Sequence, residues 1–186
     1  MMQYPPTNWM LVNVHHTQLL MFKLPASNLQ YVTSITFLLT TYSKYMAATK
    51  HTFNCGGVFV TPNTLRTVAK RQVDNILGEN PLRMSYMVGY GPYFPKRIHH
   101  RGSSLPSLSV HPQTIGCDGG FNPFFHSMNQ NPNILVGAIV GGPNQNDGFP
   151  DDRGDYSQSL RTSNLHQWWD CWTFSVLLPV AINVRF

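Results

Sequence analysis

The chain has 186 residues, of which 42% are hydrophobic and 11% are charged, so it can bury one hydrophobic core and is not a disordered polymer. Its apolar runs fall short of the ~20 residues of a membrane-spanning helix, so we expect no membrane partner. The formal net charge of +5 comes from scattered Lys and Arg residues without a basic helix face or an RNA-binding motif. We therefore expect no nucleic-acid partner.

The N-terminal segment, residues 1–20, interrupts its apolar stretch with polar residues such as Asn8, Asn13 and His15. It lacks the basic start and the continuous apolar core of a signal peptide, so we predict no signal peptide in this chain. The three cysteines are odd in number and lack metal-type spacing. The sequence therefore predicts no metal site and leaves the disulfide state open.

Two helices are predicted from apolar residues at helical spacing. The first runs from Asn28 to Thr49, with Ser27 or Asn28 as its cap. Its broad apolar face predicts a mostly buried helix that packs on more than one side. The second begins at Thr61-Pro62, a capping residue followed by proline at the first helical position, and stops at Gly78. The face of the first helix consists of Leu29, Val32, Ile35, Phe37, Leu38, Leu39, Tyr42, Tyr45 and Met46.

Residues 79–155 are predicted to be mainly loop, because Gly, Pro and Asn turn signals recur through them. Within them, the apolar run 134–140 fits a helix, a strand or a buried extended segment. A loop region this long in a compact domain is usually functional or disordered. Its aromatic, His and Arg residues favour a functional surface.

Two clusters of polar residues stand out in this region. Residues 97–104 combine two imidazoles and two guanidiniums in a Gly/Ser loop, and these groups can donate hydrogen bonds to sugar hydroxyls. The alternative is a solvated basic loop with one histidine tied to the backbone. Residues 147–156 hold four carboxylates, which suit paired-acid glycoside hydrolysis or an acidic turn that caps a helix near Asp155. Pro150 and the absence of alternating ligands argue against an EF-hand calcium loop.

Missing motifs exclude a phosphate-binding loop and leave a Ser/His/Asp hydrolase as a poor alternative. Gly141-Gly142-Pro143 lacks the glycine spacing and the Lys-Ser/Thr pair of a phosphate-binding loop. A Ser/His/Asp hydrolase assembled from Ser103, His99 and Asp151 lacks the Gly-x-Ser-x-Gly nucleophile turn.

Several motifs of the chain occur in an order that matches one family. They lie at residues 28–34, 54–57, 74–91, 97–104, 133–143 and 149–153. Together they resemble the plant-type family 9 glycoside hydrolases, which are endo-β-1,4-glucanases. The resemblance covers Met21 to Ser159.

The resemblance implies an all-α fold, the C-terminal part of an (α/α)6 barrel with long loops. It implies inverting hydrolysis of cellulose or another β-1,4-glucan without a cofactor. His99 matches the family's active-site histidine, Arg101 its sugar-binding arginine and Asp151 an acidic position of its second signature. We therefore predict His99 and Asp151 as catalytic residues. The predicted substrate-binding residues are Arg101, His100, Tyr90, Tyr93 and Asp152.

The sequence departs from the family at both ends. Where the family has the glutamate that acts as general acid, this chain has Leu160, and the Asp-rich motif that supplies the base is absent. Leucine cannot donate a proton, so we predict no cellulase activity for this chain. If suitable synonymous codons are chosen, a one-base frame shift allows the residues after Leu160 to be read as the family's continuation, including Gly-Gly in place of Trp168-Trp169. We therefore interpret the tail as a frame-shifted C-terminus.

The resemblance and the departures from it divide the chain into a poorly matching segment 1–20, a partial catalytic domain 21–159 and an aberrant tail 160–186. We expect a monomer and, from the family, an extracellular or cell-wall location. Two alternatives stay open: a non-catalytic glucan-binding remnant that uses Tyr86, Tyr90, Tyr93 and Phe94 as stacking rings, and a product that does not fold.

Overall fold

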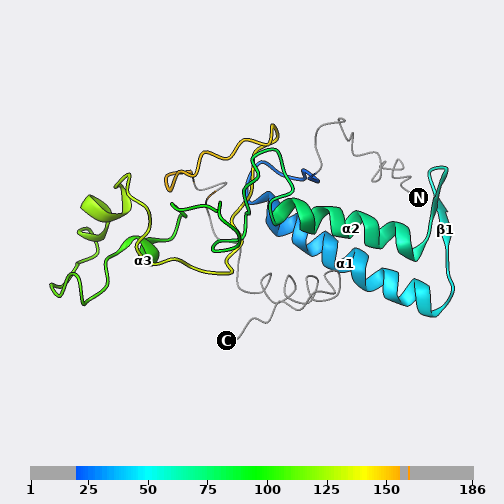
Figure 1. The fold of residues 1–186 in the computed structure, drawn as a ribbon, viewed down its shortest axis with the longest axis horizontal. Helices are drawn as coiled ribbons and strands as arrows, with labels where there is room; N and C mark the ends of the chain where they lie inside the picture. Colours follow the sequence, from blue (N-terminus) through cyan, green and yellow to red (C-terminus); the bar gives the residue numbers. More distant parts are fainter. Residues whose placement is uncertain (1–19, 156–158, 160–186) are drawn as a thin grey trace, which may run out of the picture.

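A helical hairpin with long loops at one end forms the framework of the protein (Figure 1). The computed structural model describes residues 20–155 and residue 159. Helix α1 (Asn28–Ala48) and helix α2 (Pro62–Ile76) lie side by side, and strands β1 (Phe53–Cys55) and β2 (Val58–Val60) connect them. The loops carry a short helix, α3 (Arg101–Ser104), and an irregular π-helical segment, η1 (Gly120–Phe125). None of the helices in this part of the chain has the length and hydropathy needed to cross a membrane.

Helix α1 begins at Asn28, as predicted, but a tertiary contact caps it. Ser27 makes no side-chain capping hydrogen bond. The backbone N–H of Leu29 instead donates to the carbonyl of Gly141 (2.9 Å). The buried Asn28 amide donates to Met21 O (2.8 Å) and accepts from Lys23 N (2.7 Å), which fixes the chain that enters the helix. The start of α1 is therefore tied to the loops that follow α2.

The predicted burial of the apolar face of α1 is wrong for much of that face. Leu38, Tyr42 and Tyr45 expose 60%, 48% and 69% of their surface. The buried stripe instead includes hydroxyl residues such as Thr36 and Thr40, each of which donates to the carbonyl one turn earlier. Apolar residues occur around most of this helix, so their spacing alone could not identify the side that meets α2.

Helix α2 confirms its predicted start and end. The hydroxyl of Thr61 accepts from Thr64 N (3.1 Å), and Thr64 Oγ1 accepts from Thr61 N (3.2 Å). Pro62 occupies the first turn, and Gly78 follows the helix with a φ of 122° that favours glycine. Its inner face is buried, at Leu65, Ala69, Val73 and Ile76.

The hairpin between the helices departs from the all-α prediction. Phe53 pairs with Val60 and Cys55 with Val58, in antiparallel register. Gly56 and Gly57 form the turn with φ values of 57° and 86°. Positive φ at both central residues is the geometry of the type I′ turn that joins short antiparallel strands. The Gly-Gly pair is thus the sequence signal for these strands.

An extended pair of segments closes the core where α1 begins and α2 ends. Val88 N donates to Ala138 O (2.8 Å), and Val140 N donates to Tyr86 O (3.1 Å). Only the end of the run 134–140 is therefore buried and extended, at residues 138–140, whereas residues 134–137 form a turn in which Ile134 and Val136 are exposed. The core cluster that results consists of Leu20, Leu29, Val32, Val73, Ile76, Tyr86, Val88, Ile98, Ala138, Ile139 and Val140.

Tyr86 is a core residue and cannot be a sugar-stacking ring. Its exposed fraction is 0%, and its ring packs against Phe149 at a centroid distance of 5.7 Å. Its hydroxyl finds no hydrogen-bond partner among the described residues. Burial, together with the negative charge of Asp147, raises the pKa of this hydroxyl well above its ordinary value. The stacking role proposed for Tyr86 is therefore corrected.

Replacing Asp147 with asparagine is expected to raise the melting temperature at neutral pH. Burial raises the pKa of the Asp147 carboxyl, so folding favours its protonated form. The stability from this preference is present below the carboxyl's unfolded-state pKa and is lost as the pH rises through the folded-state pKa. Asparagine removes the partly buried charge and tolerates the φ of 59° at this position. Thermal unfolding of both proteins should differ at pH 7 and converge below about pH 4; a constant difference across pH would contradict this cause.

Candidate functional site

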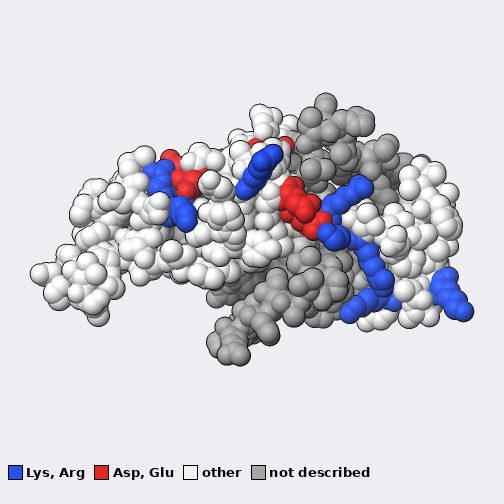
Figure 2. All heavy atoms as spheres, in the orientation of Figure 1, with Lys and Arg blue, Asp and Glu red and all other residues white. Residues whose placement is uncertain are grey.

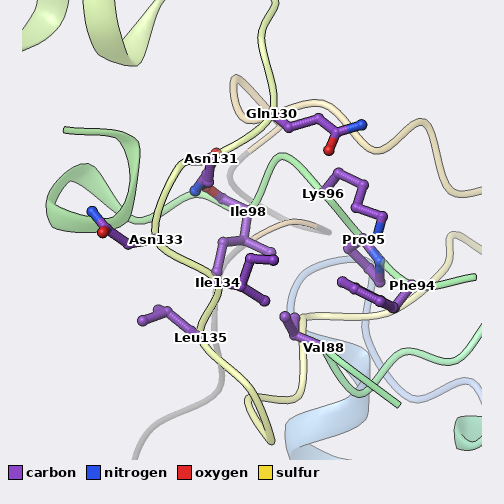
Figure 3. Close-up of a pocket in the computed structure, with 10 residues that line it drawn as sticks. All are labelled: Val88, Phe94, Pro95, Lys96, Ile98, Gln130, Asn131, Asn133, Ile134 and Leu135. Carbon is purple, nitrogen blue, oxygen red and sulfur yellow. Dashed lines mark hydrogen bonds between the residues drawn. The ribbon is translucent and has the colours of Figure 1, made fainter. Parts of the chain in front are cut away.

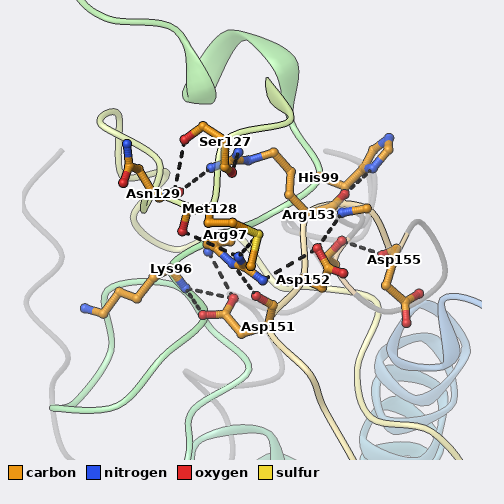
Figure 4. A network of polar contacts seen from close by, with 12 residues as sticks. Lys96, Arg97, His99, Ser127, Met128, Asn129, Asp151, Asp152, Arg153 and Asp155 are labelled. Atoms are coloured by element: carbon orange, nitrogen blue, oxygen red, sulfur yellow. Dashed lines mark hydrogen bonds and ion pairs between the residues drawn. The ribbon is translucent and has the colours of Figure 1, made fainter. Parts of the chain in front are cut away.

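Three loop segments meet around the predicted site: residues 96–104, 124–131 and 149–155 (Figure 4). Both polar clusters singled out in the sequence lie here, although they are far apart along the chain. A buried arginine, Arg153, joins all three segments.

The guanidinium of Arg153 is enclosed by oxygen atoms of the second segment. It donates to the carbonyls of Phe125 (2.6 Å), Ser127 (2.8 Å) and Asn129 (2.7 Å), and more weakly to Phe124 (3.2 Å). Its Nε and Nη2 atoms both reach Asn131 Oδ1, at 2.9 and 2.6 Å. The residue is 3% exposed, so these contacts replace water around a buried charge.

The amide of Asn131 extends this network to the first segment. Its Nδ2 atom donates to Ile98 O (3.0 Å) and to the hydroxyl of Ser103. One asparagine therefore connects Arg153 to the residues on either side of His99. The loop of the second segment and the histidine loop are held as one unit.

The groups around Arg153 shift the pKa of its guanidinium in opposite directions. Burial lowers the pKa of its guanidinium, and the nearby charge of Arg97 lowers it further, whereas Asp151 and Asp152 raise it. The ordinary pKa of arginine is so high that the group stays charged.

His99 is oriented by the backbone of Arg153. Its Nδ1 atom lies 2.8 Å from Arg153 O. A carbonyl only accepts hydrogen bonds, so Nδ1 carries the proton, and in the neutral ring Nε2 is the acceptor. The ring meets Phe125 edge-on at 5.2 Å, and the His99 backbone N–H donates to Ser159 O (2.9 Å).

His100 has the opposite hydrogen-bonding role. Its Nδ1 atom accepts from Ser103 N (3.1 Å) and thereby caps helix α3. The sequence offered a loop with one histidine tied to the backbone as the alternative to a sugar site. Here two histidines are tied, and the sugar-binding role of His100 stays a prediction.

Arg101 lies against residues 117–121, which precede the second segment. Its guanidinium sits over the ring of Phe121 at 4.4 Å and donates to Cys117 O. The ring of His126 stacks near Phe121 at 5.7 Å. A Cβ atom at Gly120 would lie 3.0 Å from the Arg101 Nη2 atom, so glycine leaves room for the guanidinium. This arrangement places a cationic donor among aromatic rings beside His99.

Asp151 and Asp152 differ in their surroundings. The Asp151 carboxylate accepts from the backbone N–H groups of Lys96 (2.9 Å) and Arg97 (3.0 Å), and its carbonyl accepts from Arg97 Nε (2.8 Å). This carboxylate therefore fastens two loops together, and its catalytic role stays a prediction. Asp152 pairs with Arg97 at 3.5 Å, and its side chain is 54% exposed.

The two tyrosines predicted to bind substrate lie on another loop, between Val88 and Phe94. Tyr90 and Tyr93 expose 39% and 69% of their surface, so both rings are accessible. The neighbouring Phe94 is covered by Lys96, whose Nζ lies 3.3 Å from the ring centroid. Phe94 is therefore less suited to stacking than the two tyrosines.

A small cavity under this loop is lined by residues such as Val88, Ile98 and Leu135 (Figure 3). Its volume of about 20 Å³ holds about one water molecule and is too small for a sugar ring. Within the described ranges, no group of His, Cys, Asp or Glu side chains could hold a metal ion. Cys55 and Cys117 are free thiols, and Cys171 lies outside the described residues, as do Leu160 and the tail.

Known proteins resemble the chain in sequence. A sequence model of glycosyl hydrolase family 9 matches residues 4–165. Endoglucanase 9 of Arabidopsis thaliana is 69% identical over 140 residues, which is 75% of this chain and 29% of that relative. Endoglucanase 3 of Oryza sativa subsp. japonica is 59% identical over 140 residues, or 75% of this chain and 28% of the relative. The chain thus spans less than a third of the length of these relatives.

Solved structures of an endoglucanase and a cellulase resemble the fold. An endoglucanase of the termite Nasutitermes takasagoensis matches with a TM-score of 0.68 and 26% identity, covering 92% of this chain and 35% of that one. The cellulase Cel9M of C. cellulolyticum, solved in complex with cellobiose, matches with a TM-score of 0.56 and 25% identity, covering 84% of this chain and 29% of that one. The family match extends over most of the chain, in agreement with the ordered motifs. The chain therefore belongs to glycosyl hydrolase family 9.

Proposed function

We propose that the three loop segments form part of the β-1,4-glucan binding cleft of an endoglucanase, and that the chain as printed binds glucan without hydrolysing it. Family membership supports the substrate class, since relatives carry the name endoglucanase and Cel9M was solved with cellobiose. The observation that carries the proposal is the placing of Arg101 over the ring of Phe121 near His99, whose ring is oriented by the Arg153 carbonyl.

This group suits the chemistry of a neutral sugar. Glucan hydroxyls donate and accept hydrogen bonds, and the faces of the rings are apolar. In the proposed cleft, Arg101 donates, the exposed part of Asp152 accepts, and Tyr90 and Tyr93 stack on sugar faces. His99 offers an imidazole whose proton is assigned to Nδ1. Asp151 supports the cleft by holding residues 96 and 97.

The proposed absence of hydrolysis rests on the lack of a general acid at position 160. Inverting hydrolysis needs one carboxyl group that protonates the leaving oxygen and a second that activates water. Leu160 stands where the family has its general acid, and an aliphatic side chain cannot transfer a proton. We also propose that the family's (α/α)6 barrel is the setting of this cleft. The monomeric state and the extracellular or cell-wall location stay predictions.

Titration with cellotetraose tests the proposal. We expect saturable binding by calorimetry or NMR, and about tenfold weaker binding for Arg101→Ala, because charge-assisted hydrogen bonds are lost. Arg71→Ala, on the exposed side of α2, is the matched control and should bind like the parent. A protein that unfolds cooperatively but binds no cellotetraose would overturn the binding role. Release of reducing sugar from soluble cellulose that disappears in His99→Ala would overturn the absence of hydrolysis.

A further inference from the structure

An exposed methionine contacts an arginine where the three loop segments meet. Met128 lies in the second segment and exposes 77% of its surface. Its sulfur lies 3.2 Å from Arg97 Nη1, and its backbone oxygen lies 3.4 Å from the same nitrogen (Figure 4). The thioether is therefore accessible from solvent and in contact with a cationic hydrogen-bond donor.

Other contacts hold the guanidinium of Arg97 in place. Its Nε atom donates to the carbonyl of Asp151 (2.8 Å), and its Nη2 atom pairs with Asp152 at 3.5 Å. The side chain of Arg97 is only 15% exposed. A guanidinium is planar and presents its donors in a fixed fork, so these contacts leave Nη1 directed at Met128. The donor is therefore in position before any chemical change at the sulfur.

Donor and acceptor are unequal in this contact. The N–H group of a guanidinium is a strong, charge-assisted donor, whereas a thioether sulfur is a weak acceptor. Oxidation of methionine to the sulfoxide adds a polar oxygen to the sulfur. The side chain of Met128 is exposed, so rotation about its Cγ–Sδ bond can bring that oxygen to Arg97 Nη1. The sulfoxide thus suits this donor better than the thioether does.

The other methionines of the described part of the chain have different surroundings. Met46 is 1% exposed, and Met21, Met84 and Met87 are partly buried against the main apolar core. A sulfoxide at any of these positions would place a polar oxygen among apolar side chains and would destabilise the fold. Among the methionines of residues 20–155, Met128 is therefore the one that combines high exposure with a preformed donor for the oxidised form.

We infer that Met128 is a site of reversible oxidation by a peroxide, and that its sulfoxide binds Arg97 more tightly than the thioether does. A sulfur lone pair attacks one oxygen of hydrogen peroxide, and the O–O bond breaks. The departing hydroxide takes the proton of the transferred hydroxyl and leaves as water. The sulfur is oxidised by two electrons, and the peroxide is reduced by the same two. This modification would join the first and second segments more firmly, independently of glucan binding.

The charge of the surrounding surface suits an uncharged oxidant. Figure 2 shows basic and acidic side chains together over the loops, whereas basic ones form a band over the helical hairpin. Hydrogen peroxide carries no charge, so a surface of mixed charge neither attracts nor repels it. Access to the sulfur therefore depends on exposure, which is high at Met128.

Mild oxidation of the full chain with hydrogen peroxide tests this inference. Peptide mapping by mass spectrometry should show Met128 oxidised on the order of tenfold faster than Met46. The oxidised protein should melt about 2–4 °C higher than the untreated one, because a charge-assisted hydrogen bond is gained. Methionine sulfoxide reductases should reverse the rise. Met128→Leu, treated in the same way, accounts for oxidation at every other methionine, and its melting temperature should not rise.

A second pair of variants tests the role of the arginine. In Arg97→Gln, Met128 should still be oxidised, but oxidation should no longer raise the melting temperature. Arg71→Gln, on the exposed side of α2, is the matched control and should keep the rise. If Arg97→Gln fails to fold, NMR of the parent gives the same answer, because the side-chain N–H signals of Arg97 should shift on oxidation.

Three results would overturn the inference. The first is oxidation of Met128 no faster than that of Met46. The second is a melting temperature that stays the same or falls when Met128 is oxidised. The third is a rise that persists in Arg97→Gln, or Arg97 signals that do not move. No sugar is present in these assays, so failure of glucan binding would not affect them.

Discussion

Replacing Arg153 with methionine is expected to lower the free energy of unfolding by about 3–5 kcal/mol, the usual cost of breaking a buried charged network. The guanidinium is the shared donor for four backbone carbonyls and for Asn131 Oδ1. Methionine fills similar space but leaves those oxygens buried without hydrogen bonds. Denaturant unfolding of the two proteins measures the difference.

Two companion variants separate geometry from charge. Arg153→Lys keeps the charge but has a single nitrogen, so we expect it to recover less than half of the loss. Arg71→Met, an exposed arginine on α2, should change stability by at most about 0.5 kcal/mol. The NMR shifts of His99 give a second readout, since its Nδ1 proton depends on the Arg153 carbonyl. An Arg153→Met protein with parental stability and an unchanged His99 tautomer would contradict the described network.

Replacing Gly142 with alanine is expected to destabilise the fold by about 2–5 kcal/mol, the sum of backbone strain and overpacking. Gly142 has a φ of 97°, where side chains are rarely accepted. A Cβ atom there would lie 2.5 Å from Leu29 Cγ, which belongs to a side chain with an exposed fraction of 0%. Leu29 is the second residue of α1 and donates its backbone N–H to the carbonyl of Gly141, so relieving the clash would disturb the start of that helix.

Gly91→Ala isolates the strain from the clash. Gly91 has a φ of 69°, but nothing lies within 4 Å of a Cβ atom built at this position. We expect this variant to lose only about 1 kcal/mol, from the left-handed backbone alone. Thermal or urea unfolding of both variants against the parent provides the comparison. Equal losses would show that Leu29 moves aside at little cost.

The parts of the fold that could be predicted are those fixed by local chemistry. Thr61-Pro62 determines the start of α2 through a cap and a preset φ, and Gly78 determines its end. The orientation of α1 could not be predicted, because its apolar residues leave several possible inner faces. The β hairpin shows only its Gly-Gly turn in the sequence, because each of its strands has three residues and is too short for a clear alternating pattern.

The sequence indicates the two polar clusters of the candidate site, but not the hydrogen bonds that join them. The basic and acidic segments do meet, with Asp151 against Lys96 and Arg97. Arg153 was missed as the organising residue, because an arginine in an acidic stretch is expected to pair with its neighbours. Its partners are mainly backbone carbonyls of residues 124–129. Every residue has a backbone carbonyl, so the sequence cannot show which of them accept a hydrogen bond from Arg153. Family resemblance made His99 a candidate site residue, and its catalytic role stays a prediction. The structure adds which of its nitrogens faces the Arg153 carbonyl.

The pairing of Val88 with Ala138 divides the described chain into two parts that are held together by different forces. The helical hairpin and its extended pair owe their cohesion to apolar burial. In residues 89–137, the buried hydrophobic side chains are Ile98 and Phe125, and much of the remaining cohesion comes from hydrogen bonds to loop carbonyls and amides. Such a part opens at a lower free energy than an apolar core. Hydrogen exchange should therefore proceed in residues 89–137 while α1 and α2 stay protected, so the region that carries His99 and Arg101 can rearrange without melting the helices.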